Sequence, residues 1–188
     1  MIRGAAKGLL KLMSVNLYEV FEHFCNATDS KLRWGDDRKR WTSFVLDIFD
    51  NFMRSKGLGE SRRNYMGIDA VWRDPSLGNI LLALEHENER RTEDFVAQEM
   101  HRLLDLKSLN KVAITYPHAG EERETIEAIR AMIPRGAMLA SDTFFENYLI
   151  IFGFDTRHKA RRAILWRGYS INRKGEVDER ERVVFAQD

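Results

Sequence analysis

The sequence predicts an α/β domain built on a mixed β-sheet flanked by helices. Segments with apolar residues at helical spacing alternate with short apolar runs rich in β-branched and aromatic residues. The first two of these runs are joined by turn residues, whereas stretches long enough for crossover helices separate the later ones. The sheet should therefore contain both antiparallel and parallel neighbours.

Composition favours one ordered domain. A chain of 188 residues with 44% hydrophobic and 31% charged residues has the size and character of a single globular unit. The formal net charge of +1 gives no general attraction to an anionic partner. Cys25 is the single cysteine, so an internal disulfide is excluded and a reducing, cytoplasmic location is expected.

The N-terminal stretch lacks the features of a signal peptide, because Lys7 and Lys11 interrupt its apolar residues and no cleavage site follows. No segment approaches the ~20 apolar residues of a membrane span, so no membrane partner is expected. We expect one domain over 1–188, with a helical extension at 1–36, a core at 37–169 and a C-terminal tail at 170–188.

Two helices are predicted before the sheet. Ser14 can cap the first, whose apolar positions include Leu17, Phe21 and Phe24. The second runs from Asp37 to Lys56, and Gly57 follows it where a C-terminal cap belongs. Its apolar stripe should pack on the sheet and comprises Trp41, Phe44, Val45, Ile48, Phe49 and Phe52.

The sheet is predicted to begin with a β-hairpin. Residues 65–72 and 80–87 are β-like runs, and the stretch between them contains Pro75, Gly78 and Asn79. A helix capped by Thr92 should follow, and a second helix should begin at the acidic stretch EERE. Further strands are expected at 111–116, 147–154 and 163–169.

Three carboxylates stand near the ends of the two hairpin strands. Side chains alternate along a strand, so Glu85 and Glu87 share one face while His86 points to the other. A hairpin centred on Leu77 places Asp69 opposite Glu85. Like charges opposed across a strand pair are destabilising, so this patch needs a neutralising partner.

A divalent cation is one such partner. Mg²⁺ binds a few carboxylates while keeping waters, which leaves positions for a phosphate oxygen and a water nucleophile. These residues thus permit metal-assisted phosphodiester hydrolysis. The alternative is that each acid is simply solvated on the outer face of its strand. His86 is expected to be packed or hydrogen-bonded.

The stretches GIDAVW (67–72) and LALEHE (82–87) resemble the core motif of the PD-(D/E)XK nuclease superfamily. The resemblance implies a restriction-endonuclease-like fold and a Mg²⁺ or Mn²⁺ site. Asp69, Glu85 and Glu87 would be the catalytic and metal-binding residues. It also implies that an acid on a preceding helix, Asp47 or Glu22, joins the metal shell.

Two positions depart from the family pattern. Glu87 stands where the family usually has Lys, and Gly67 stands two residues before Asp69. Some type II restriction enzymes of this superfamily also carry Glu at the Lys position, so metal-dependent cleavage stays open. Loss of activity in an inactive homologue is the other reading.

A second group of residues is basic. The stretch from Thr156 to Gly175 contains many Lys and Arg residues and no Asp or Glu. Its first part reads as a loop, whose Arg157, Lys159, Arg161 and Arg162 are expected to contact phosphates of nucleic acid. Trp166 and Tyr169 could stack on unpaired bases, but both lie within a strand pattern, so core packing is expected for at least one of them. Arg90 and Arg91, just behind the acids, are expected to be solvated at a helix entry or to pair with acid or phosphate.

The expected function is a Mg²⁺-dependent nuclease acting on nucleic acid, with DNA the expected substrate and a homodimer a further expectation from the family. The alternative is a catalytically inactive module that binds nucleic acid or another protein. The two differ in whether the chain cleaves nucleic acid when Mg²⁺ is present.

Overall fold

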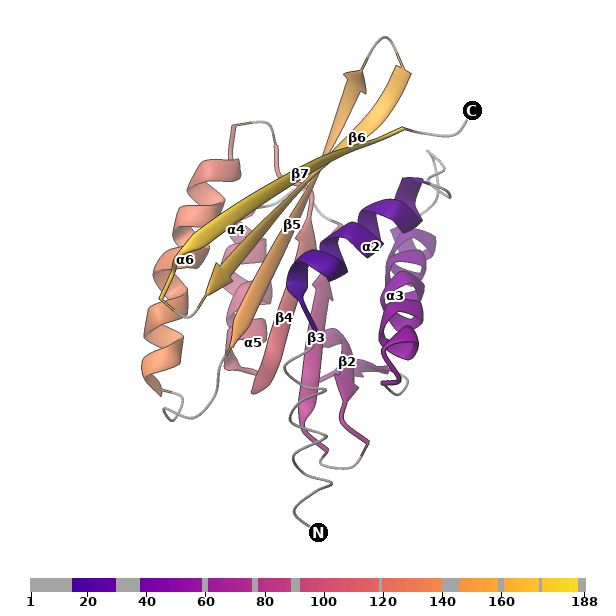
Figure 1. Cartoon of the computed structure of the whole chain (residues 1–188). Coiled ribbons are helices and arrows are strands. Elements are labelled where there is room, and N and C mark those ends of the chain that lie inside the picture. Colours follow the sequence, from indigo (N-terminus) through magenta and orange to yellow (C-terminus); the bar gives the residue numbers. More distant parts are fainter. Residues whose placement is uncertain are drawn as a thin grey trace.

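The computed structural model describes residues 15–29, 38–58, 61–75, 78–88, 92–118, 120–139, 146–158, 161–172 and 174–185. Over this part of the chain a seven-stranded mixed sheet carries helices on both faces (Figure 1). The predicted α/β class is confirmed at this level.

The strands lie in the sheet in their order along the chain. The first three are antiparallel neighbours, β3, β4 and β5 run parallel, and the last three are again antiparallel. Their bounds are β1 (Arg62–Tyr65), β2 (Ile68–Arg73), β3 (Ile80–His86), β4 (Ser108–Thr115), β5 (Asn147–His158), β6 (Arg161–Asn172) and β7 (Val177–Phe185).

Two helical layers enclose the sheet (Figure 1). Helices α2 (Leu17–Asp29) and α3 (Arg38–Ser55) cover one face, where Phe21, Phe49 and Trp72 are buried. The other face is covered by α6 (Glu122–Leu139) and by a continuous helical segment that begins at Thr92. That segment consists of α4 (Thr92–Asp94), the π-helix η1 (Phe95–Met100) and α5 (His101–Asp105).

The ends of the first two helices follow from local chemistry. Gly57 has φ 71° and its N–H donates to the carbonyl of Arg54 at 2.9 Å, while Leu58 N–H donates to Met53. These two bonds form the Schellman motif, so the predicted end of α3 is confirmed. At α2, Asn16 Oδ1 accepts the N–H of Tyr18 at 2.9 Å and so acts as the cap. Ser14, the expected cap, lies outside the described residues.

The predicted hairpin register is confirmed. Trp72 pairs with Leu82 and Ala70 with Leu84, as a hairpin centred on Leu77 requires. A register shift follows between Trp72 and Arg73. The residues that carry the acids are thus placed on neighbouring strands at the end of the sheet where β3 and β4 terminate.

The prediction of one strand at 65–72 was wrong. The chain turns at Met66 and Gly67, whose φ values are 53° and 83°, so β1 ends at Tyr65 and β2 begins at Ile68. This pair of left-handed residues matches a two-residue hairpin turn. Met is uncommon at such a position, and the sequence therefore hides the turn.

The loop predicted for Arg157 to Arg162 was also wrong. Strands β5 and β6 continue into a long hairpin in which Arg157 pairs with Arg162 and His158 with Arg161. The hairpin extends beyond the rest of the sheet in Figure 1. At the end of this hairpin charged residues replace apolar ones, so the alternation of apolar residues that identifies a strand stops before the backbone pairing ends. Lys159 lies outside the described residues.

The described parts of the two expected terminal segments belong to the domain. Residues 177–185 of the 170–188 segment, expected to be a tail, form strand β7, which pairs with β6. Its charged residues suit an edge strand, where exposed polar side chains discourage pairing with other chains. Within 1–36, α2 buries Phe21 and Phe24 at 0% and 1% exposure, so this helix belongs to the core. None of the described helices is both long and apolar enough to cross a membrane.

Candidate active site

Asp69 of β2 and Glu85 of β3 lie side by side. The N–H of Asp69 donates to Glu85 Oε2 at 3.2 Å, and the N–H of His86 donates to Asp69 Oδ2 at 2.8 Å. Each carboxylate is thus held through one oxygen by the backbone. The hairpin register brings these two predicted acids together.

Burial makes this pair electrostatically costly. Glu85 is 6% exposed, and this burial, together with the nearby charge of Asp69, raises the pKa of Glu85 to about 8. Burial also raises the pKa of Asp69, against the opposing effects of the His86 N–H and Arg102. A proton or a cation near the pair therefore lowers its free energy at neutral pH.

The guanidinium of Arg102 on α5 is the cation nearest to Glu85 among the described residues. Its Nη2 lies 3.9 Å from Glu85 Oε1 and also contacts the carboxylate of Glu99 on η1. The Cδ of Arg102 lies 3.4 Å from the position that a Cβ on Gly67 would occupy. The β1–β2 turn therefore borders Arg102, and Glu99 and Arg102 join Asp69 and Glu85 on one face of the sheet.

Glu87 follows the end of β3. Its N–H donates to the carbonyl of Ile114 at 2.9 Å, and its charge contributes to the raised pKa of Glu85. Within the described residues, no three His, Cys, Asp or Glu side chains form a group able to hold a metal ion. Of the three predicted metal ligands, Asp69 and Glu85 are the two that hydrogen bonds place side by side.

His86 points to the opposite face, as strand alternation predicts. Its Nε2 lies 2.9 Å from Tyr116 Oη and its Nδ1 3.2 Å from Thr42 Oγ1, with the donor at each bond set by the tautomer. Burial lowers the pKa of His86 to about 3, so the ring is neutral. The predicted packed and hydrogen-bonded role is confirmed.

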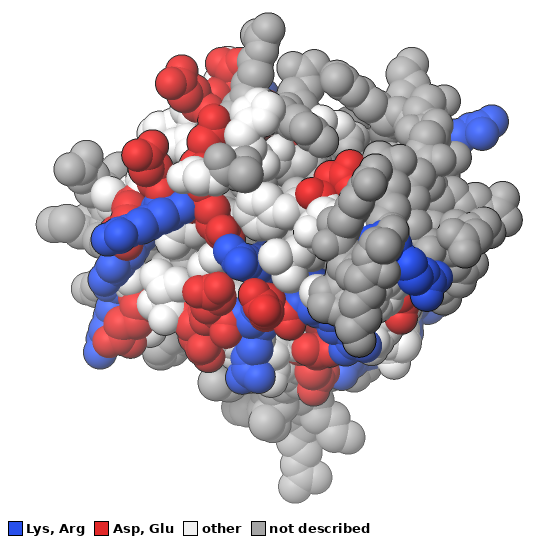
Figure 2. Space-filling model, turned by 90° about the horizontal axis from the view of Figure 1, so that it is seen from above, with Lys and Arg blue, Asp and Glu red and all other residues white. Residues whose placement is uncertain are grey.

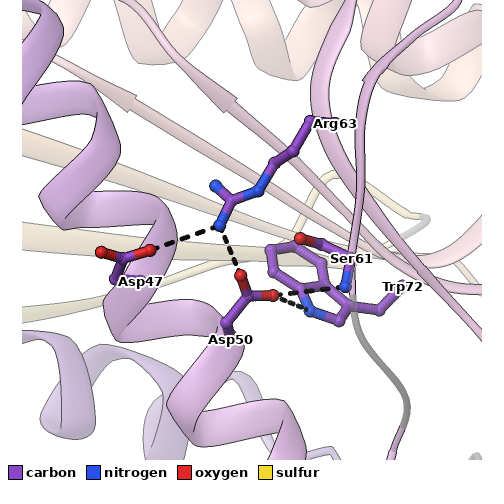
Figure 3. Close-up of polar contacts among 5 residues, drawn as sticks. All are labelled: Asp47, Asp50, Ser61, Arg63 and Trp72. Carbon is purple, nitrogen blue, oxygen red and sulfur yellow. Dashed lines mark hydrogen bonds and ion pairs between the residues drawn. The ribbon is translucent and has the colours of Figure 1, made fainter.

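The proposed helix acids lie elsewhere. Figure 3 shows Asp47 and Asp50 of α3 beside Arg63, whose Nη2 is 3.5 Å from Asp47 Oδ1. Asp50 also contacts Arg63, and its Oδ1 accepts Trp72 Nε1 at 2.9 Å. Because α3 covers the His86 face, Asp47 lies across the sheet from Glu85.

Glu22 is no closer to the acid pair. It forms a 2.7 Å ion pair with Arg182 of β7, at the other edge of the sheet. Neither of the two helix acids expected from the resemblance is therefore placed to complete a shell around Asp69 and Glu85.

Of the predicted basic residues, Arg157, Arg161 and Arg162 lie on the projecting β5–β6 hairpin. Arg161 is exposed, with its guanidinium 5.3 Å from the ring centre of Phe185. Trp166 and Tyr169 are 0% and 7% exposed, so the prediction that at least one of them packs in the core is confirmed. Arg90 and Arg91 lie outside the described residues.

Figure 2 views the end of the sheet where β3 and β4 terminate. Acidic and basic side chains are interspersed on this face, and no broad area of one sign stands out among the described residues. Any attraction of an anion to this end must therefore come from individual side chains. Arg102 is the described basic residue that lies against the acid pair.

Sequence reasoning missed Glu99 and Arg102. Their signal was an acid and a base three residues apart on the helix after the motif, a spacing that places both side chains on one side of a helix. The same spacing occurs in many exposed helices, so it did not single out this pair.

Comparisons of the chain with family models, with curated proteins and with solved structures each found no match.

Proposed function

We propose that this chain is a metal-dependent nuclease of the PD-(D/E)XK type, with its centre at Asp69 and Glu85. The observation that carries the proposal is the buried pairing of these two carboxylates across β2 and β3. The order of a helix, three antiparallel strands, a helical segment and a parallel strand agrees with a restriction-endonuclease-like core.

The two carboxylates fit a small divalent cation. Asp69 Oδ2 and Glu85 Oε2 accept backbone N–H groups, while Asp69 Oδ1 and Glu85 Oε1 accept no hydrogen bond from any described residue. Mg²⁺ is often held in proteins by one or two carboxylates, with waters and substrate phosphate completing its octahedron. Asp69 and Glu85 would hold the ion, with Glu87 beside them.

The reaction would be hydrolysis of a phosphodiester. A bound divalent cation supplies charge stabilisation to the phosphate and acidifies a water molecule. The water oxygen forms a bond to phosphorus as one ester P–O bond breaks, which yields a phosphomonoester and a hydroxyl group. Glu87 would help position the water and take up its proton. The main-chain N–H groups of Asp69 and His86 keep the two carboxylates in place.

The test is a cleavage assay on plasmid and on single- and double-stranded oligonucleotides of DNA and RNA. Nicking with Mg²⁺ or Mn²⁺ that stops with chelator, and is lost in Asp69→Asn and Glu85→Gln, is the expected result. Asp47→Asn serves as the matched control, since this acid lies on the other face, and should cleave normally. Full cleavage by either site variant would exclude the assignment.

A second candidate is an inactive binding module with the same sheet. Glu87 at the usual Lys position favours it, because the family's water-orienting residue is then missing. This candidate predicts salt-sensitive binding of nucleic acid without cleavage in any metal. The same oligonucleotides, run in a binding assay, separate the two.

A further inference from the structure

Arg102 occupies the solvent side of two buried acids. The side chains of Glu85 and Glu99 are 8% and 13% exposed, whereas that of Arg102 is 44% exposed. A single nitrogen, Nη2, is shared between the two carboxylates. Arg102 therefore lies on the more exposed side of the two acids and offsets their negative charge, with 44% of its side chain open to solvent.

The contact between Arg102 and Glu85 is weaker than a hydrogen bond. At 3.9 Å the attraction is electrostatic and lacks the directionality of a donor bonded to an acceptor. The aliphatic part of the Arg102 side chain lies near Gly67 in the β1–β2 turn, whereas its guanidinium lies at the acids.

A metal ion and the guanidinium of Arg102 would compete for the position beside the carboxylate of Glu85. A divalent cation on Asp69 and Glu85 would stand a few ångströms from Nη2, where like charges repel strongly in a partly buried site. The planar donors of the displaced guanidinium match two oxygens of a phosphate.

We propose that Arg102 is an internal counter-cation that a divalent metal ion displaces from Glu85, and that the freed guanidinium then binds a phosphate of the nucleic acid. This inference rests on the proposed nuclease function and assigns a residue that the sequence motif does not contain. Glu99 holds Arg102 beside the site during the exchange.

The experiment compares wild type, Arg102→Gln and Arg102→Lys as purified full-length chains. Mn²⁺ affinity is measured by calorimetry without nucleic acid, and affinity for an oligonucleotide duplex is measured in Ca²⁺. Arg130→Gln is the matched control, since Glu127 and Arg130 form an exposed ion pair of the same spacing on α6. Thermal melts verify that each variant folds.

Removal of the charge should have opposite effects on the two ligands. Arg102→Gln should bind Mn²⁺ on the order of tenfold more tightly, because one repelling charge is gone, and the duplex on the order of tenfold more weakly. Arg102→Lys should bind Mn²⁺ like wild type and the duplex less tightly, since Lys keeps the charge without the planar donors. Arg130→Gln should match wild type in both.

Three outcomes would overturn the proposal. If wild type binds Mn²⁺ and Arg102→Gln binds it equally well, Arg102 does not compete with metal, while the nuclease function stands. If Mn²⁺ affinity rises but duplex affinity is unchanged, the phosphate contact is refuted. If neither wild type nor Arg102→Gln binds Mn²⁺, the metal site itself is refuted and this inference falls with it.

Discussion

The main-chain N–H of His86 donates a 2.8 Å hydrogen bond to Oδ2 of Asp69. The same residue fixes its ring on the other face of the sheet through Thr42 and Tyr116. One segment of β3 therefore links the helix layer on one face to a carboxylate on the other. The free energy of unfolding should therefore depend on the protonation of the His86 ring on one face and of the carboxylates on the other.

His86 should make the protein less stable as the pH falls. The pKa of the folded group is about 3, against an ordinary 6.5, so below pH 6.5 the unfolded chain binds a proton that the folded chain excludes. The contribution of the neutral His86 ring to the free energy of unfolding is complete above pH 6.5 and is lost as the pH falls toward the folded-state pKa of about 3. Between pH 7 and 5, His86→Gln should lose about 2 kcal/mol less than wild type in urea unfolding. Parallel losses in the two proteins would contradict this role.

Glu85 should have the opposite effect, because its contribution to the free energy of unfolding decreases as the pH rises. Its pKa is raised from 4.5 to about 8, so the folded state binds a proton that the unfolded state has released over this range. Its contribution to stability is complete below pH 4.5 and is lost as the pH rises through about 8. In chelator, Glu85→Gln should lose less stability than wild type between pH 5 and 8, by about 2 kcal/mol or more. The exposed Glu127→Gln is the control and should follow wild type.

Asp50 should matter more to stability than its neighbour Asp47. Asp50 accepts the indole N–H of the fully buried Trp72, and it also contacts Arg63 (Figure 3). Asp50→Ala leaves these donors without their acceptor and should cost about 2 kcal/mol of unfolding free energy. Asp47 is 72% exposed and pairs at 3.5 Å, so Asp47→Ala should cost less than about 0.5 kcal/mol. Equal costs in urea unfolding would contradict this ranking.

Gly168 of β6 should not tolerate a side chain. A Cβ there would lie 2.7 Å from Cδ2 of Phe21, which is 0% exposed on α2. Gly168→Ala should therefore destabilise the domain by about 1–3 kcal/mol through overpacking. In a Phe21→Leu background the same change should cost less, since the ring edge is gone. A double-mutant cycle with no coupling energy would argue against this contact.

The parts of the fold that were predictable have strong local signals. Gly57 marked the end of α3, and the turn residues around Leu77 fixed a hairpin register that alternation then extended to Asp69 and Glu85. The alternation of apolar residues and the turn residues were enough to predict the register of β2 and β3, because a shift of one residue would turn the apolar face of a strand to solvent. The nuclease reading drawn from those acids remains a prediction.

The edges of the sheet gave no such signal. Strands β1 and β7 are the two edges of the described sheet, and charged residues make up half of β1 and more than half of β7, so neither has the apolar pattern on which the prediction relied. The turn at Met66 lacks the usual Asn or Asp, and the basic end of the β5–β6 hairpin looked like a loop. Edge strands are selected for polarity, which removes the feature by which strands are recognised.

Partners distant in sequence were the other limit. Lys111 is 0% exposed in β4 and pairs at 2.9 Å with Glu146, a residue that follows the whole of α6. Arg102 likewise meets Glu85 only because the helical segment after β3 packs back on the sheet. No spacing rule in one sequence identifies such pairs.

The consecutive order of the strands has a consequence for synthesis. Since every strand pairs with the one translated just before it, none must be inserted later between two that are already joined. The sheet can grow from β1 toward β7 as the chain leaves the ribosome, which proceeds from the N-terminus. A nascent chain of which only β1 to β3 have emerged contains Asp69 and Glu85 but still lacks Arg102, which pairs with Glu85 in the finished domain.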